Sequence, residues 1–261
     1  MRGERASERW RRRLEEWAIP DRILLAAPVS PWVLPPSCFT AETNPPNSST
    51  TKRSLDLLRS AGSAPTVLDV GCGAGRASLH LVPPAVAVVG VDKSQPLLEQ
   101  FRTEAASRRV PVEAFAGEWT AIEGTVPSAD LVVCSQVLYN VPEIEPFLRA
   151  LQSHAQLGVV VEIDTRHPLA KLNGAWNHFW GLERPRGPTA MDLLDVLAEL
   201  GIRPHIDVVE LRDHKGRIGP ADIERTRVRL CLTEDRDPDI RQFLETEQRP
   251  GRQLATIWWE R

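Results

Sequence analysis

Three acidic residues in the first half of this 261-residue chain, Asp69, Asp92 and Glu118, each accompany a short apolar run. Carboxylates accept hydrogen bonds from hydroxyls and amines, and they attract cations. If the three runs are neighbouring strands that end at one edge of a sheet, their acids would meet there and could bind a ligand that offers hydroxyls or a positive charge. The elements around them must therefore build such a sheet.

The first acid lies in an apolar run that leads into a glycine-rich turn. Residues 66–70 are mostly β-branched and apolar, and the run is long enough for a buried parallel strand. Gly71, Gly73 and Gly75 follow at alternate positions, and residues 76–81 can open a helix. Glycine permits a sharp turn and a close approach to a ligand, while a helix N-terminus offers free N–H groups. The segment predicts the first unit of a doubly wound nucleotide-binding sheet.

The spacing of the glycines distinguishes two nucleotide ligands. The dinucleotide fingerprint G-x-G-x-x-G requires a third glycine where this chain has Arg76. The pattern from Asp69 to Gly75 is D-x-G-x-G-x-G, and it resembles motif I of the class I S-adenosylmethionine (SAM) methyltransferases. SAM carries a sulfonium and an ammonium, so a carboxylate at the strand end suits it better than it suits a pyrophosphate. An NAD-dependent oxidoreductase is a remote alternative.

The resemblance implies a SAM site, with S-adenosylhomocysteine (SAH) as product, across three strand ends. It assigns the ribose hydroxyls to Asp92, the exocyclic amine of adenine to Glu118 and the cover of the adenine ring to Trp119. The family more often has Asp at the position of Glu118. The predicted cofactor-binding residues are Asp69, Gly71, Gly73, Gly75, Asp92, Lys93, Gly117, Glu118, Trp119 and Cys134.

The segments after the fourth and fifth expected strands supply candidates for acceptor binding. The resemblance places Tyr139 and Asn140 at the border of the substrate pocket. Trp176, Phe179 and Trp180 could form an aromatic wall for an apolar or planar acceptor, or could pack their helix onto the sheet. The run 138–141 and the His-Pro loop resemble uncharacterised methyltransferases from actinobacteria, which brings no substrate with it.

Methyl transfer needs a nucleophile in line with the S–CH3 bond and, for a hydroxyl acceptor, a base of near-neutral pKa. His167 and His178 are the first candidates for that base, and Glu162 is the third. The alternative for each histidine is a structural role.

Alternating strand and helix patterns predict the rest of the fold. Strands are expected at residues 66–70, 86–91, 112–116, 130–134, 158–163, 206–211 and 254–259, and helices at 52–61, 94–107, 143–157 and 189–200. Right-handed crossovers place the loops that follow the parallel strands at one edge. We therefore expect an α/β fold, a seven-stranded doubly wound, mostly parallel Rossmann-like sheet. The resemblance implies that the last strand is antiparallel.

The domain prediction has two parts. Residues 1–50 form an N-terminal helical and Pro-rich lid segment, and residues 51–261 form the SAM-binding domain. An insertion at about 219–249 precedes the last strand, with two expected helices at 221–230 and 238–246. Arg225, Arg227 and Arg229 alternate with Val228 and Leu230, so a strand there remains an alternative.

Composition limits the class of protein. The chain is 42% hydrophobic and 26% charged with a net charge of −3, which is typical of a soluble globular protein and weighs against a general nucleic-acid surface. No apolar run approaches membrane-spanning length, and no signal peptide is expected. The four cysteines have no metal-ligand spacing, so we expect no metal and reduced thiols in the cytoplasm.

The Arg-rich segment 1–20 predicts an amphipathic helix with Trp10, Leu14 and Trp17 on one face. Such a helix can contact nucleic acid or a membrane, or it can pack as a lid with a solvated face. The first hypothesis is a SAM-dependent methyltransferase of a small molecule, monomeric or homodimeric and without a membrane partner. The alternatives are an rRNA or tRNA methyltransferase that uses this helix, and a SAM-binding regulator without activity.

Overall fold

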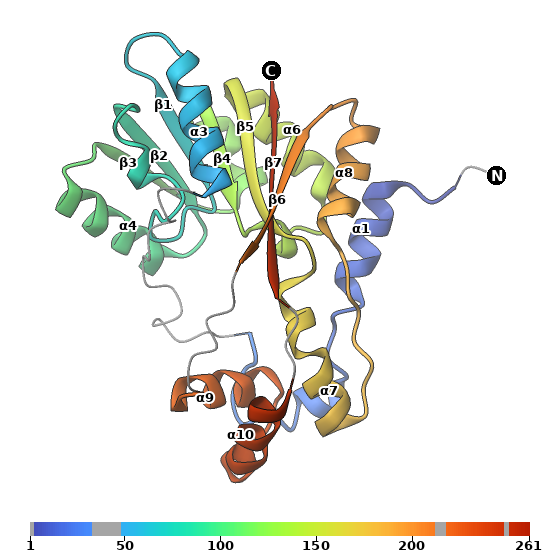
Figure 1. Ribbon diagram of the computed structural model, residues 1–261. Coiled ribbons are helices and arrows are strands. Elements are labelled where there is room, and N and C mark those ends of the chain that lie inside the picture. Colours follow the sequence, from blue (N-terminus) through green and yellow to red (C-terminus); the bar gives the residue numbers. More distant parts are fainter. Residues whose placement is uncertain (1–2, 33–47, 212–217, 248–250) are drawn as a thin grey trace.

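A seven-stranded sheet forms the centre of the computed structural model, which describes residues 3–32, 48–211, 218–247 and 251–261 (Figure 1). The strand order is β3-β2-β1-β4-β5-β7-β6. The strands are β1 (Thr66–Val70), β2 (Ala87–Asp92), β3 (Val112–Ala116), β4 (Ala129–Ser135), β5 (Ala155–Asp164), β6 (His205–Leu211) and β7 (Arg252–Glu260). Strands β1 to β5 pair in parallel, and β7 runs antiparallel to β5 and β6. The predicted fold class is confirmed.

The strand order reverses between β1 and β4, which pair through Asp69 and Val133. At such a switch point the loops after the two strands diverge to opposite sides and leave a crevice beyond the carboxyl ends of the strands. The glycine turn follows β1 and therefore begins at this crevice. On the other side of β1, Asp92 at the end of β2 pairs with Ala116 of β3, so the second and third acids also lie at this edge.

Helices cover both faces of the sheet. One face packs against α3 (Ser49–Ser60), η2 (Leu79–Leu81) and α4 (Gln95–Arg108), with Leu58 and Phe101 fully buried between the layers. The other face packs against α5 (Trp119–Ile122), α6 (Ile144–His154) and α8 (Ala190–Glu199). Helix α1 (Ala6–Glu15) lies outside this second layer, beside α8 and α6. Short 3-10 turns η3 (Glu123–Thr125) and η4 (Leu138–Asn140) connect these elements.

The helix expected at residues 76–81 is wrong, because only the 3-10 turn η2 forms there. Val82 is followed by Pro83 and Pro84. A residue before proline is pushed out of the helical region, and proline has no N–H to continue the hydrogen-bond ladder. The chain therefore enters β2 after a single turn.

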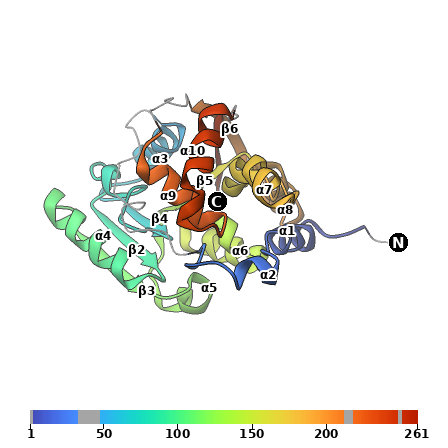
Figure 2. The ribbon, with the colours of Figure 1, turned by 90° about the horizontal axis from the view of Figure 1, so that it is seen from below.

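A second group of helices lies beyond the carboxyl edge of the sheet, and we call it the helical cap (Figures 1 and 2). It comprises α2 (Asp21–Leu24), η5 (Pro168–Leu172), α7 (Asn173–Trp180), α9 (Pro220–Arg229), η6 (Glu234–Arg236) and α10 (Asp237–Thr246). Ile23, Trp176, Leu230 and Ile240 belong to one buried cluster that is separate from the two clusters on the sheet. Three segments far apart in the sequence therefore share one core.

The cap contains both helices predicted within 219–249, and the alternative of a strand there is wrong. Ile223, Thr226 and Leu230 are buried at helical spacing, and the N–H of Gly219 donates to Asp222 Oδ2 at 3.0 Å to close the first turn.

Among the described residues no helix has the length and apolar character that a membrane span requires.

Candidate cofactor and acceptor site

The glycine turn after β1 adopts backbone angles that favour glycine. Gly71 has φ +75° and Gly73 has φ +52°, both in the left-handed region. A Cβ at Gly71 would lie 2.2 Å from Cγ2 of Val137 in the loop after β4, so only glycine lets these two loops meet. A Cβ at Gly73 would meet no atom within 4 Å. The turn therefore presents bare backbone to open space at the switch point.

Asp92 is held against this turn by backbone donors. Its Oδ2 accepts from the N–H of Gly73 at 2.9 Å and its Oδ1 from the N–H of Ser94 at 2.8 Å. Each carboxylate oxygen keeps a second lone pair, which a ribose hydroxyl can use. The N–H of Gly117 donates to the carbonyl of Asp92 at 3.1 Å, so the loops after β2 and β3 are joined.

The outer side of this cluster is solvent-exposed. Lys93 Nζ lies 3.9 Å from Glu118 Oε1, and both side chains are largely exposed. Asp92, Lys93, Gly117 and Glu118 therefore come together as the sequence predicted, although their roles toward a ligand remain a prediction. The arrangement fits a group with vicinal hydroxyls because it combines a fixed carboxylate with an accessible one.

Asp69 lies beneath the turn and is fully buried. Its Oδ2 accepts from Ser78 Oγ at 2.6 Å, while its Oδ1 has no hydrogen-bond partner among the described residues. Burial raises the pKa of Asp69 to about 7, since desolvation penalises the charged form. An unpaired buried acceptor of this kind fits a cationic ligand group nearby.

Two predicted cofactor residues lie in the core. Trp119 is 4% exposed, and its ring packs edge-on against His154 with 4.8 Å between the ring centroids. This packing leaves the ring little surface to cover an adenine. Cys134 is 1% exposed within β4, where burial raises the pKa of its thiol. Only its backbone is placed to line the crevice.

Glu162, a candidate base, is buried at the end of β5 and is the centre of a hydrogen-bond network. Its Oε2 accepts from Thr50 Oγ1 at 2.7 Å and its Oε1 from Ser135 Oγ at 2.9 Å. Arg76, directly after the glycine turn, places Nη2 3.4 Å from Oε1. Thr50 also bonds Thr256 Oγ1 at 2.9 Å. The network joins the glycine turn, β4, β5, β7 and the start of α3.

His167 lies in a stack of rings at the edge between the sheet and the cap. It stacks on Trp17 at 4.2 Å between centroids and meets Tyr139 edge-on at 5.1 Å. Its Nδ1 accepts from the N–H of Leu169 at 3.2 Å, and burial lowers its pKa to about 4. The neutral ring therefore carries its proton on Nε2.

Tyr139 connects this stack to the end of β5. Its hydroxyl accepts a short hydrogen bond from the N–H of Asp164 and donates to the carbonyl of the same residue at 3.2 Å. Burial, followed by the charge of Asp164, raises the pKa of Tyr139. The carboxylate of Asp164 forms a two-pronged ion pair with Arg252, at 2.6 and 3.3 Å. Asn140 beside Tyr139 is exposed.

The remaining predicted residues lie on α7 within the cap. Trp176 is 3% exposed in the cap core, and Trp180 Nε1 donates to the carbonyl of Leu230 at 2.8 Å. Phe179 and the exposed His178 both contact the ring of Phe243 on α10. The three aromatic side chains therefore pack α7 within the cap, and not onto the sheet as the packing alternative expected. The described contacts of His178 do not include the glycine turn.

Several site residues were missed by the sequence reasoning, namely Thr50, Arg76, Ser135, Asp164 and Arg252. Arg252 carried a usable signal: it precedes an expected antiparallel strand, so it must lie at the carboxyl edge of the parallel strands. Thr50 carried none, because its partner is 112 residues away.

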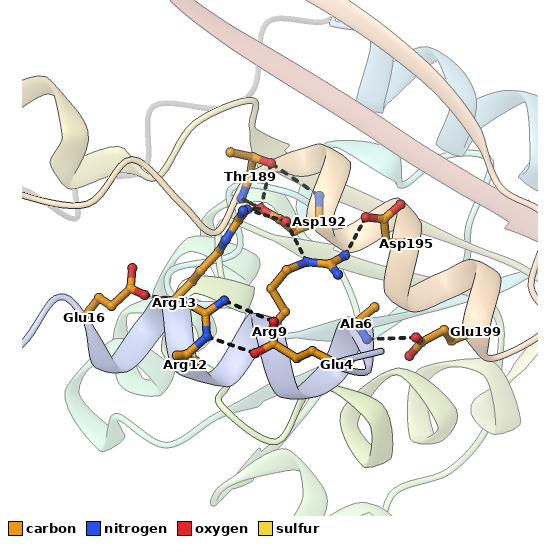
Figure 3. Close-up of polar contacts among 10 residues, drawn as sticks. All are labelled: Glu4, Ala6, Arg9, Arg12, Arg13, Glu16, Thr189, Asp192, Asp195 and Glu199. Atoms are coloured by element: carbon orange, nitrogen blue, oxygen red, sulfur yellow. Dashed lines mark hydrogen bonds and ion pairs between the residues drawn. The ribbon is translucent and has the colours of Figure 1, made fainter. Parts of the chain in front are cut away.

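The Arg-rich helix α1 is attached to α8 by ion pairs (Figure 3). Arg9 and Arg13 both contact the buried carboxylate of Asp192, and Arg9 Nη2 lies 2.6 Å from Asp195 Oδ2. The N–H of Ala6 donates to Glu199 Oε1 at 2.8 Å. On the apolar face of α1, Trp10 is fully buried. The helix is a packed part of the protein.

Comparisons with known proteins find similarity to methyltransferases. Residues 67–158 match the model of a methyltransferase domain family. A Geobacillus sp. (strain WCH70) protein that is named as a candidate methyltransferase is 34% identical over 84 residues. The match spans 31% of this chain and about a third, 34%, of that relative.

Solved structures share the fold over most of their length. A candidate methyltransferase from Bacillus halodurans C-125 aligns with a TM-score of 0.56 and 15% identity over 82% of this chain and 99% of that chain. The YcgJ protein of Bacillus subtilis aligns with a TM-score of 0.55 and 16% identity over 80% of this chain and 98% of that chain. The magnesium protoporphyrin IX methyltransferase of Synechocystis PCC 6803, solved with bound SAH, aligns with a TM-score of 0.51 and 15% identity over 80% of this chain and 81% of that chain.

At these identities the solved structures show a common fold, and the family match covers the segment from β1 to β5. The glycine turn, the orphaned acceptor of Asp69 and the fixed carboxylate of Asp92 fit the cofactor of that family. Residues 67–158 therefore match a methyltransferase domain, and the chain has the same fold as solved methyltransferases.

Proposed function

We propose that this chain transfers the methyl group of SAM to a small-molecule acceptor that binds between the carboxyl edge of the sheet and the helical cap. The observation that carries the proposal is the cap itself. Its helices come from residues 21–24, 168–180 and 220–246 and share a buried core beyond the strand ends. A cover assembled from three segments at this edge suits an acceptor that can be enclosed.

The state of α1 favours a small molecule over RNA. A helix that binds nucleic acid must present free cations to phosphates. Arg5, Arg9, Arg11, Arg12 and Arg13 all form ion pairs with carboxylates of this chain. Binding RNA with this helix would require breaking those pairs first.

We propose that Asp69, Gly73, Asp92 and Glu118 hold the cofactor, with Asp69 closest to its cationic groups. SAM, when bound, supplies a methyl group activated by the sulfonium. The chain then has to align the nucleophile of the acceptor with that methyl group and exclude water, and alignment of this kind can supply most of the rate enhancement.

A general base is a secondary element of the proposal. His167 presents an N–H at Nε2, and a pKa of about 4 makes it a weak proton acceptor, so it is better suited to donate a hydrogen bond to the acceptor. Glu162 already accepts from three side chains. His178 lies among cap residues. We therefore propose alignment as the main contribution and treat the three bases as hypotheses.

The first test is calorimetric titration of SAH into the wild type, Asp92→Ala and the control Asp56→Ala, which removes an exposed acid on α3. We expect binding near micromolar, about −8 kcal/mol, and a loss of roughly 2 kcal/mol in Asp92→Ala only. A wild type that does not bind SAH would contradict the proposal.

The second test is turnover. SAH release in the presence of a small-molecule panel is expected, and none in the presence of total RNA. Binding of SAH, without any formation of SAH from SAM in the presence of the acceptors, would favour the alternative of a SAM-binding regulator without activity. Replacement of both His167 and His178 by Ala should leave SAH affinity nearly intact. An unchanged turnover in that variant would remove both histidines from the mechanism.

The location and assembly of the protein remain proposals. Cys72, Cys134 and Cys231 are buried free thiols, which supports the cytoplasmic location that we propose. A monomer or homodimer is the expected state, and the division into residues 1–50 and 51–261 remains a prediction. Within the first part, α1 packs beside α8 and α6, and Ile23 of α2 belongs to the core of the cap.

A further inference from the structure

Arg76 reaches from the glycine turn to the ends of two neighbouring strands. It is the first residue after Gly75, and its Nη2 lies 3.4 Å from Ser135 Oγ and 3.4 Å from Glu162 Oε1. Ser135 is the last residue of β4 and pairs with Glu162 of β5. The guanidinium therefore lies at the carboxyl edge of the sheet, beside the switch point between β1 and β4.

A buried carboxylate fixes the guanidinium in this place. The side chain of Glu162 is 2% exposed, whereas that of Arg76 is 38% exposed. Glu162 is itself held by Thr50 Oγ1 at 2.7 Å and by Ser135 Oγ at 2.9 Å. Within the described residues the hydrogen bonds of the guanidinium all involve Nη2, so Nε and Nη1 keep N–H donors for another partner.

Gln136, the residue after Ser135, has two features of a ligand site. Its φ is +61°, in the left-handed region that residues other than glycine rarely adopt, and its N–H donates to the carbonyl of Glu162 at 2.9 Å. Its side-chain Nε2 is buried and has no hydrogen-bond partner among the described residues. Strained backbone and unpaired buried donors concentrate at functional sites. Both observations indicate that the end of β4 is shaped for a ligand that brings acceptor atoms.

The cofactor of the proposed function offers a group that matches the free donors of Arg76. SAM and SAH both end in an amino acid, which carries an ammonium and a carboxylate on one carbon. Recognition of that end needs an acid and a base beside the same turn. Asp69 lies beneath the glycine turn with an unpaired Oδ1, and Arg76 directly follows the turn. The two residues therefore have the charges that the amino-acid end requires.

We propose that Arg76 binds the carboxylate of the cofactor's amino-acid end, and that Glu162 is the positioning residue that holds the guanidinium toward it. Guanidinium and carboxylate groups form charge-assisted hydrogen bonds, and their two-pronged geometry also fixes orientation. The cofactor is then held by Asp92 at the ribose and by Arg76 at the amino acid, which aligns the sulfonium between them. The inference rests on the proposed function, because it takes SAM as the ligand of the glycine turn.

The test is calorimetric titration of two ligands, SAH and decarboxylated SAH, into the full-length chain. Decarboxylated SAH keeps the adenosine, the sulfur and the amine, and it lacks only the carboxylate. The wild type should bind SAH about tenfold more tightly than decarboxylated SAH. In Arg76→Gln the two ligands should bind equally, because only SAH loses a partner. Arg76→Lys keeps the charge without the fork and should keep part of the preference.

Two further variants separate ligand binding from a structural role. Arg203→Gln removes an exposed charge between α8 and β6 and should keep the full preference for SAH. Glu162→Gln keeps the size of the positioning side chain and removes its charge, so the preference should fall to about threefold. A purely structural role of Arg76 and Glu162 would instead weaken both ligands to the same extent.

The outcomes distinguish this inference from the proposed function. Equal binding of the two ligands by the wild type, or a tenfold preference that persists in Arg76→Gln, would overturn the inference and leave SAM as the cofactor. Equal weakening of both ligands in Arg76→Gln would also overturn it, because Arg76 would then act on the turn and not on the carboxylate. A wild type that binds neither ligand contradicts the proposed function itself.

Discussion

Thr50, in the first turn of α3, donates a hydrogen bond to Glu162 at the end of β5, with 2.7 Å between Oγ1 and Oε2. Because this hydroxyl has one proton, its contact with Thr256 Oγ1 at 2.9 Å must be a hydrogen bond that it accepts. The buried carboxylate thus depends on the position of α3. The same carboxylate accepts from Arg76, which follows the glycine turn. The start of α3 and the cofactor turn are therefore linked through one side chain.

Replacement of Thr50 by Val keeps the shape of the side chain and removes its donor. The free energy of unfolding should fall by about 1–3 kcal/mol, because a buried carboxylate loses a partner that water cannot replace. Urea denaturation measures the change. Thr120→Val, at an exposed position on α5, is the control and should change stability little. Equal stability of Thr50→Val and the wild type would mean that Glu162 does not depend on this bond.

The ion pairs of α1 predict a contrast between two arginines. Arg13→Gln removes a partner of the buried Asp192 and should lower the free energy of unfolding by about 1–2 kcal/mol. Arg11→Gln breaks an exposed pair with Glu143, 2.6 Å apart, and should cost less than about 0.5 kcal/mol. Urea denaturation of both variants provides the comparison. Equal costs would contradict the assignment of α1 as a helix packed through Asp192.

The fold was predictable because its signals are local. Apolar runs of strand length, which alternate with helical patterns and end in acids or glycines, determine the parallel sheet. Thr189 indicated the start of α8, because its side chain caps the N-terminus of that helix. The prediction of a helix at residues 76–81 was wrong because Pro83 and Pro84, directly after this segment, prevent a helix from continuing. Local patterns also place Asp92, Gly117 and Glu118 at one edge.

The candidate site was less predictable because side-chain direction depends on packing. Trp119 follows a strand end, as a ring that covers a ligand would, but its ring turns into the core against His154. His167 is a residue type that can act as a base, but it stacks on Trp17, which lies 150 positions earlier in the sequence, and burial lowers its pKa. No local pattern encodes such contacts.

Asp69 predicts a dependence of stability on pH. Its pKa is about 7 in the folded chain because of burial, above the ordinary value of 3.8, so the folded state holds a proton that the unfolded state has already released. Stability should therefore fall as pH rises from about 4 to 7, with a loss of about 2–3 kcal/mol between pH 5 and 8. Asp69→Asn should remove this part of the pH dependence. Urea denaturation at both pH values, for wild type and variant, measures it.

A bound cation should shift this balance. SAM carries positive charge, and its binding near Asp69 would favour the ionised carboxylate, so SAM affinity should rise between pH 6 and 8 and binding should release a proton near pH 7. Calorimetry in two buffers of different ionisation enthalpy detects that proton. The same pH dependence of SAM affinity in Asp69→Asn as in the wild type would assign the effect to another group.

His167 predicts the opposite slope at lower pH. Burial lowers its pKa to about 4, below the ordinary value of 6.5, so the unfolded state binds a proton before the folded state does. The contribution of His167 to stability is complete above pH 6.5 and should be lost as pH falls toward 4, by up to about 3 kcal/mol. His167→Phe keeps a ring for the stack with Trp17 and cannot be protonated, so its stability should fall less between pH 6.5 and 4.5. His178→Phe, at an exposed position, is the matched control and should follow the wild type. If His167→Phe and the wild type lose the same stability over this range, the imidazole is hydrated in the folded chain and remains available as a base near neutral pH.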